Sequence, residues 1–237
     1  MSPAPPADRL WNRARLGAAA AFVLCAFLLG FRSPGLSRDE AVGLTGAVRM
    51  LTPGQASFAH DPASGFTFAG RWWPLMATPD RGPLRGYLSL LPFAAYGANY
   101  STVRLLAALL GAFGIWGFSI LTRDLFGPRT AVAVSWILAV HPACLALTLY
   151  RGGVGEWMVS FGLLSIALAQ YLKDPGERTA LWLGVAAGFG VWTRVDFVWL
   201  PASAAAAGAL ALGKRILIPR RHAAVLAAGA LLGAAPL

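Results

Sequence analysis

Asp39 and Glu40 are adjacent carboxylates that directly follow the first long apolar segment of the chain. Neighbouring positions on a helix point about 100° apart, so the pair cannot flank a bond as the two carboxylates of a glycoside hydrolase do. One of the two can instead face a pocket while the other caps a helix. Their chemistry therefore depends on which other charged groups share their side of the membrane.

The same pair also has an ordinary structural explanation. Ser37 and Glu40 have the spacing of a capping box, in which the acid three residues after the N-cap bonds back to the N-cap backbone. An acid at Asp39 would be favoured by the helix dipole alone. Because a capping box does not require an acid there, Asp39 is the stronger candidate for chemistry. The pattern predicts a short amphipathic helix over 37–51, lying along the membrane surface.

Composition places the chain in a membrane. Its 237 residues are 57% hydrophobic and only 13% charged, with a mean hydropathy of +0.60. Soluble domains carry about 25% charged residues, so the fold class expected is an all-α, polytopic transmembrane helix bundle. The net charge of +10 lies mostly at the ends of apolar segments, which indicates topology and anionic head groups rather than nucleic acid.

The apolar pattern predicts about seven spans, each near the length that a bilayer requires. We expect them at 14–32, 102–122, 130–149, 157–172, 179–193, 196–212 and from 222 onward. A single domain, 1–237, would then comprise a tail (1–13), a long outer loop (33–101) and a bundle (102–237), with the C-terminus apparently truncated within the last span. The loop would carry two interfacial helices, 37–51 and 84–96, separated by an irregular stretch over 52–83.

Charge sets the expected orientation. The short loops richest in Arg and Lys are cytoplasmic by the positive-inside rule, so the N-terminus is expected in the cytoplasm and the chain in the cell (inner or plasma) membrane. The acids then expected outside are Asp39, Glu40, Asp61, Asp80, Glu156 and Asp196, together with Arg81, Arg85, Arg151 and Arg194. Ion carriers place ionisable groups within their spans, whereas this distribution favours a site at the outer membrane interface.

Several short motifs occur in a characteristic order. They are Asp39-Glu40, Arg81-Gly82-Pro83-Leu84, Gly97, Val103-Arg104-Leu105-Leu106, Phe126-Gly127, Tyr150-Arg151 with Glu156, and Gly188 to Arg194. In order and spacing the chain resembles the N-terminal half of GT-C glycosyltransferases. The similarity is closest to the group of dolichyl-phosphate-mannose protein mannosyltransferases and lipid A aminoarabinose transferases, and it covers most of 16–215.

The resemblance implies transfer of a hexosyl or pentosyl group from a polyprenyl-phosphate-linked donor to a lipid, glycan or protein acceptor on the outer side, with inversion. It implies that Asp39 is the general base for the acceptor hydroxyl, with Glu40 beside it. Arg81, Arg85 and Arg151 would bind the phosphate leaving group, because guanidinium matches phosphate geometry. Glu156 would hold the acceptor or position a pocket arginine.

Each assignment has an alternative. The arginines could contact lipid head groups, and Glu156 could form an ion pair with Arg151. His60 and Asp61 could help to bind a divalent metal ion, but two residues do not make a site, so no cofactor is assigned. The family's lysine and double proline before the short helix are replaced here by Arg81, Gly82 and Pro83, which leaves the donor sugar open. A transporter or flippase of lipid-linked substrates and a non-catalytic membrane subunit remain the competing functions.

Two further features concern packing. Gly184 and Gly188 have the small-xxx-small spacing that allows close helix contacts, although glycine is also simply common in membrane helices. His141 before Pro142 predicts a packing or kink position within the third span.

Overall fold

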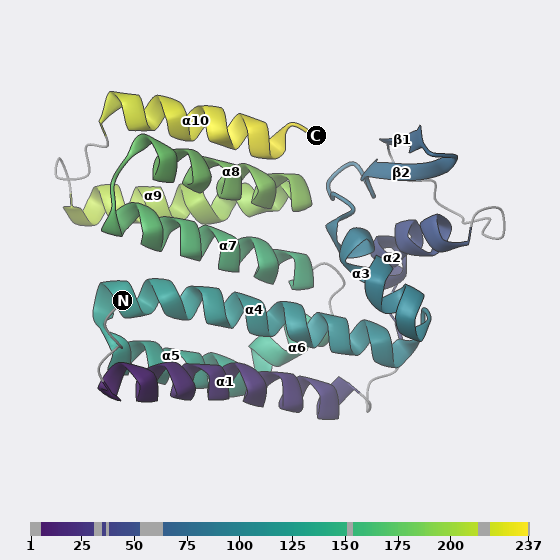
Figure 1. Ribbon diagram of the computed structural model, residues 1–237, viewed down its shortest axis with the longest axis horizontal. Coiled ribbons are helices and arrows are strands. Elements are labelled where there is room, and N and C mark those ends of the chain that lie inside the picture. The colour runs from purple at the N-terminus through teal and green to yellow at the C-terminus, as the bar shows by residue number, and fades with distance from the viewer. Residues whose placement is uncertain are drawn as a thin grey trace.

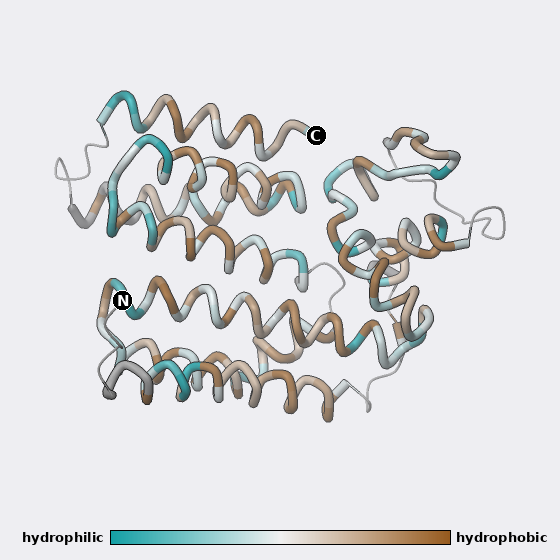
Figure 2. The backbone as a smooth tube through the Cα atoms, in the orientation of Figure 1, coloured by the Kyte–Doolittle hydropathy of each residue, from teal (hydrophilic) through white to brown (hydrophobic). Residues whose placement is uncertain are grey.

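The computed structural model describes residues 6–30, 35–36, 38–52, 64–150, 154–212 and 219–236. These residues are mostly helical. Long helices run side by side as a bundle, and two shorter helices and a β-hairpin gather at one end of it (Figure 1). In Figure 2 hydrophobic residues cover most of the bundle helices, while hydrophilic stretches mark the α7–α8 connection and the start of α10, at the end away from the hairpin.

The first part of the bundle is formed by α1 (Pro6–Gly30), α4 (Tyr100–Phe126), α5 (Pro128–Val140) and α6 (Pro142–Tyr150). Phe22 of α1, Ile115 of α4 and Leu149 of α6 form its core and are almost completely buried. Alanines complete this core, so the helices approach closely. The core therefore holds the start of α4 next to the end of α1.

The second part contains α7 (Val154–Lys173), α8 (Glu177–Thr193), a short 3-10 helix η1 (Val195–Val198), α9 (Trp199–Leu212) and α10 (Arg220–Ala234). Helices α4 and α7 join the two parts through Gly114, Gly117 and Gly162. A Cβ atom at Gly117 would lie 2.6 Å from the Gly162 carbonyl oxygen, and one at Gly114 would lie 2.6 Å from the Met158 carbonyl oxygen. Because α4 and α7 approach so closely, the start of α7 lies near the elements that surround the start of α4.

Helices α8 and α10 pack through glycines on both sides, which confirms the close packing predicted for Gly184 and Gly188. A Cβ atom at either position would overlap the backbone of α10, and the partner helix contributes Gly229 and Gly233 in the same way. Only glycine allows the two backbones to approach to this distance. The glycine pair on α10 was not predicted.

The end of the bundle is covered by α2 (Arg38–Leu51), strands β1 (Ser64–Phe68) and β2 (Arg71–Met76), and α3 (Leu84–Tyr96). The bounds of α3 agree with the predicted helix over 84–96. Leu44, Ala47, Phe93 and Val103 pack these helices onto the start of α4.

The hairpin corrects the expectation of an irregular stretch over 52–83, of which residues 53–63 lie outside the described part. β1 and β2 are antiparallel, with Phe66 opposite Trp73 and Phe68 opposite Arg71. The two connecting residues, Ala69 and Gly70, both have positive φ (52° and 71°), as a two-residue hairpin turn requires. Aromatic residues alternating along β1 favour a strand, and this short pattern was missed between glycines and prolines.

The expectation of about seven spans is not confirmed. Among the described residues two helices are long and apolar enough to cross a membrane, Leu10–Gly30 and Tyr100–Phe126. A third span is counted if Pro128–Val140 and Pro142–Leu149 form one, although they are bent by 57°. The bend confirms the kink interpretation at His141 and Pro142 within the span predicted over 130–149. The predicted tail, 1–13, is helical from Pro6.

Substituting alanine for Gly188 should destabilise the bundle by about 1–3 kcal/mol, because its methyl group would overlap the Ala230 carbonyl of α10. Thermal unfolding in detergent measures the effect. Gly17→Ala is the matched control, since a Cβ atom there would meet its nearest neighbour, Trp136, at an ordinary 3.6 Å. Equal melting temperatures for the two variants would contradict the packing described for α8 and α10.

Candidate active site

The start of α4 presents an arginine to the end of α1. Asn99 caps α4 by accepting a 2.9 Å hydrogen bond from the Thr102 backbone N–H. One turn on, the Arg104 guanidinium lies 4.8 Å from the centre of the Tyr100 ring, and the Tyr100 hydroxyl donates to the Gly30 carbonyl at 2.7 Å. A Cβ atom at Gly30 would lie 3.4 Å from the Arg104 Cβ, so glycine leaves room for the arginine's aliphatic part.

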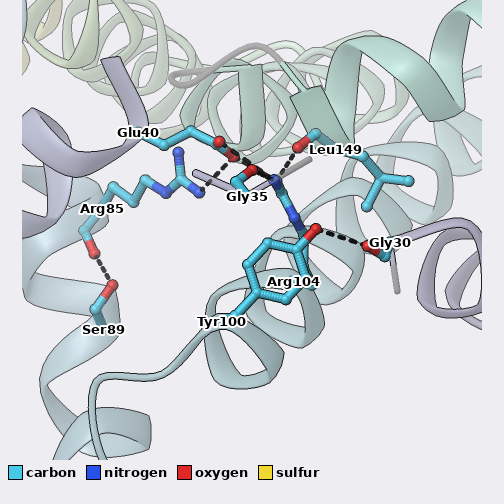
Figure 3. A network of polar contacts seen from close by, with 8 residues as sticks. All are labelled: Gly30, Gly35, Glu40, Arg85, Ser89, Tyr100, Arg104 and Leu149. Carbon is cyan, nitrogen blue, oxygen red and sulfur yellow. Dashed lines mark hydrogen bonds and ion pairs between the residues drawn. The ribbon is translucent and has the colours of Figure 1, made fainter. Parts of the chain in front are cut away.

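Arg104 forms a buried ion pair with Glu40 of α2 (Figure 3). Arg104 Nη1 lies 2.5 Å from Glu40 Oε1, and Nη2 lies 3.3 Å from Oε2. The same guanidinium donates to the carbonyl of Gly35 at 2.8 Å and to that of Leu149 in α6. Both side chains are almost fully buried, at 2% and 1% exposed. One arginine thus connects α2, α4, α6 and the segment that follows α1.

Arg85 of α3 shares the Glu40 carboxylate. Its Nη2 lies 3.6 Å from Glu40 Oε1, and the side chain is buried. Burial lowers the pKa of the Arg85 guanidinium, while Glu156 and Glu40 act to raise it. The carbonyl of Arg85 accepts a 2.6 Å hydrogen bond from the Ser89 hydroxyl (Figure 3). Two guanidinium groups therefore converge on one carboxylate between α2, α3 and α4.

Glu156 lies in the first turn of α7, just before the predicted span 157–172, and is 3% exposed. Its Oε2 atom is buried and has no hydrogen-bond partner among the described residues. Burial raises the pKa of Glu156 to about 7, although Arg85, Arg81 and Arg194 act to lower it. At neutral pH this carboxyl group can therefore hold or release a proton, unlike an exposed glutamate.

Gly43 of α2 separates this buried cluster from a small surface pocket. A Cβ atom at Gly43 would lie 3.7 Å from both Arg85 Cδ and Glu156 Oε1. The pocket is lined by residues of α2, β2 and the loop before α3, namely Val42, Gly43, Thr45, Gly46, Pro74, Ala77 and Pro83. One side of the pocket is therefore formed by α2, and the other by Pro74 of β2 with the loop that follows it.

The loop before α3 is bonded to the end of α8. The Gly82 N–H donates to the carbonyls of Trp192 and Thr193 at 3.0 and 3.1 Å, and the Val195 N–H donates to the Asp80 carbonyl at 3.1 Å. A Cβ atom at Gly82 would lie 2.6 Å from the Trp192 carbonyl oxygen, so this contact requires glycine. The backbones of Arg81 and Arg194 form a β-bridge across the joint.

Asp196 orients Arg194 at this joint. Arg194 Nε and Nη2 lie 2.9 and 2.7 Å from the two Asp196 oxygens, and Trp157 Nε1 donates to Oδ1 at 3.2 Å. The side chain of Arg81 is 20% exposed, and its Nε lies 3.7 Å from Asp80 Oδ2. The joint therefore brings two arginines to the end of the bundle that also holds Glu156.

A family model for dolichyl-phosphate-mannose-protein mannosyltransferases matches residues 80–237. The chain belongs to this family. Membership implies a membrane glycosyltransferase of the GT-C type, whose sugar donor is linked to a polyprenyl phosphate. No curated protein and no solved structure gives a match. The match to the mannosyltransferase family includes Arg81, Arg85, Arg104, Glu156 and Arg194 and begins after α2.

The predicted site residues of this mannosyltransferase-family chain are partly brought together. Glu40, Arg85 and Glu156 meet at the junction of α2, α3 and α7, and Arg81 lies at the joint with α8. Asp39 lies in the first turn of α2, but its side chain is outside the described part. Arg151, His60 and Asp61 also lie outside the described residues.

Two members of the arrangement were missed. The sequence identifies Arg104 only as part of a motif, although a lone cation in an apolar segment signals the need for a buried partner. The charge pattern predicts Arg194 on the outer side but assigns it no role. Among the described residues no group of three or more His, Cys, Asp or Glu side chains is placed to hold a metal ion.

The raised pKa of Glu156 predicts a pH-dependent stability. Between about pH 4.5, the ordinary value, and about pH 7, the folded protein binds a proton that the unfolded chain has released. The free energy of unfolding therefore falls as pH rises through this window, by on the order of 3 kcal/mol for the full shift. Glu156→Gln cannot lose this pH-dependent part of the free energy of unfolding, because glutamine does not titrate. The melting temperature of Glu156→Gln minus that of the parent protein should therefore grow as pH rises from about 5 to about 8.

Glu177→Gln is the matched control, because Glu177 lies exposed in the first turn of α8. Thermal unfolding in one detergent across this pH range compares the three proteins. A difference between Glu156→Gln and the parent that does not change with pH would contradict the raised pKa.

Proposed function

We propose that the chain transfers a sugar from a polyprenyl-phosphate-linked donor to an acceptor hydroxyl on the extracytoplasmic side of the cell membrane. The observation that supports it most strongly is the buried cluster of Glu40, Arg85, Arg104 and Glu156 at one end of the bundle. Buried charges are costly unless they are paired, so such clusters mark functional sites or structural locks. Family membership favours a site.

Asp39 is the proposed general base. It lies on the turn of α2 that Arg104 and Arg85 hold through Glu40, so that turn is fixed against α4 and α3. The acceptor oxygen would give its proton to the Asp39 carboxylate as it attacks the anomeric carbon. The bond from that carbon to the phosphate oxygen would break, with inversion, and the lipid phosphate would leave with the electron pair.

The leaving phosphate needs cations. The structure describes the side chains of two of the three arginines expected to bind it. Of these two, Arg81 is the more exposed, whereas Arg85 would reach a phosphate only by giving up its ion pair with Glu40. We therefore assign Arg81 to the phosphate and Arg85 to positioning of the two glutamates, and Arg151 stays a candidate. Arg194, which Asp196 orients beside Arg81, is an additional candidate.

Glu156 is the proposed partner of a substrate hydroxyl. Its Oε2 atom lacks a hydrogen-bond partner among the described residues, and its Oε1 atom lies just beneath Gly43 of the pocket wall. A buried polar atom without a partner is costly, so a substrate hydroxyl that supplied the missing hydrogen bond would bind favourably there. The sugar, hexosyl or pentosyl, and the acceptor, a lipid, glycan or protein, are both left open by this chemistry.

Replacing Asp39 with asparagine should lower sugar transfer by at least about 10²-fold, because general-base catalysis typically contributes that much. The measurement is transfer from a labelled polyprenyl-phosphate sugar in membranes that contain the full chain. Asp174→Asn, on the exposed α7–α8 connection, is the control and should transfer normally. Undiminished transfer by Asp39→Asn, at equal protein level, would overturn the base assignment.

A further inference from the structure

One face of the β1–β2 hairpin is packed against α3 at β2 and exposed at β1. Register places Phe66 and Trp73 side by side on this face, followed by Phe68 and Arg71 nearer the turn. Trp73 stacks against Tyr87 of α3, with ring centres 6.1 Å apart, which attaches this face to the helix. Phe66 and Phe68, in contrast, are 47% and 65% exposed.

The opposite face of β1 carries Gly65 and Thr67 instead of phenylalanine. Trp72 lies opposite Thr67, and its ring covers Gly65, where a Cβ atom would overlap it. The two faces of β1 therefore differ: phenylalanines stand on one, and glycine and threonine stand on the other. The exposed aromatic pair is thus confined to one side of the strand.

The charge on the hairpin indicates what this face meets. Between residues 64 and 76 the chain carries one cation, Arg71, and no acid. Exposed phenylalanine rings beside an arginine suit the boundary between head groups and acyl chains, where apolar side chains insert and anionic lipids attract cations.

The base of the hairpin is held at the end of the membrane bundle. Trp192, near the end of α8, donates through Nε1 to the Leu75 carbonyl at 3.1 Å, and the Tyr87 hydroxyl donates to the Pro74 carbonyl. Figure 1 shows the hairpin beyond the ends of the long helices, on the side of α2 and α3. The hairpin therefore lies at the helix ends, beside α2 and α3.

We propose that the Phe66–Phe68 face of the hairpin inserts into the head-group region of the leaflet next to α2 and α3. Pro74 and Ala77 line the pocket above Gly43, so this contact would hold the pocket at the membrane surface. A lipid-linked substrate could then reach the pocket from the bilayer without leaving it. The membrane contact itself does not depend on the reaction proposed above.

The test uses the full chain with Cys25→Ser and Cys144→Ser, which removes its two cysteines. Single cysteines at Phe68→Cys and, separately, Phe66→Cys carry a bimane fluorophore in vesicles of phosphatidylcholine and phosphatidylglycerol. Quenching by lipids with a shallow doxyl group is compared with quenching by aqueous iodide. Thr67→Cys on the opposite face is the control within the hairpin, and Leu109→Cys on α4 is the control for lipid exposure.

We expect doxyl lipid to quench both phenylalanine positions strongly, and iodide to quench them several-fold less than at Thr67→Cys. Sugar transfer by these variants tests the proposed reaction, whereas the quenching pattern tests membrane contact alone. Equal iodide quenching at all three hairpin positions, without doxyl quenching, would overturn the proposal. It would instead leave the aromatic face open to a soluble partner such as a protein or glycan acceptor.

Discussion

The buried ion pair between Arg104 and Glu40 is the interaction on which the site depends. Removing either charge from water costs several kcal/mol, and the pair is tolerable only because both carboxylate oxygens and both terminal nitrogens of the arginine have partners. Those partners come from α2, α4, α6 and the segment after α1. Relaxing any of these contacts would leave a charge buried with less compensation, so the pair holds α2 against the bundle.

The rest of the cluster follows from this constraint. With Glu40 held inward, Arg85 is drawn to the same carboxylate, and α3 is fixed between α2 and α4. Glu156 is left with burial as the main influence on its carboxyl group, which is why its pKa rises to about 7 despite three nearby arginines. The Gly82 joint then places Arg81 and Arg194 beside this end of the bundle. Proposed catalytic, proton-holding and phosphate-binding groups thus come from four separate parts of the chain.

Local patterns in the sequence predicted the helices well and the contacts between them poorly. The bounds of α3 agree with the prediction because a run of apolar residues bounded by Pro83 and Gly97 carries its own start and stop signals. The spacing from Ser37 predicts a capping role for Glu40, and Ser37 lies outside the described residues. The Glu40 carboxylate also binds arginines 45 and 64 residues further along the chain. No local rule identifies such partners. Likewise, Gly184 and Gly188 predicted close packing, but the structure was needed to identify α10 as the neighbour.

A double-mutant cycle on Glu40 and Arg104 tests this account most directly. Glu40→Gln, Arg104→Gln and the double variant are compared with the parent by thermal unfolding in detergent. Each single change should cost about 3–5 kcal/mol, because it leaves one buried charge without its nearest oppositely charged partner. The double change should cost clearly less than the sum, since it leaves two neutral amides that can bond to each other. Additive costs, or single variants as stable as the parent, would contradict the central role of this pair.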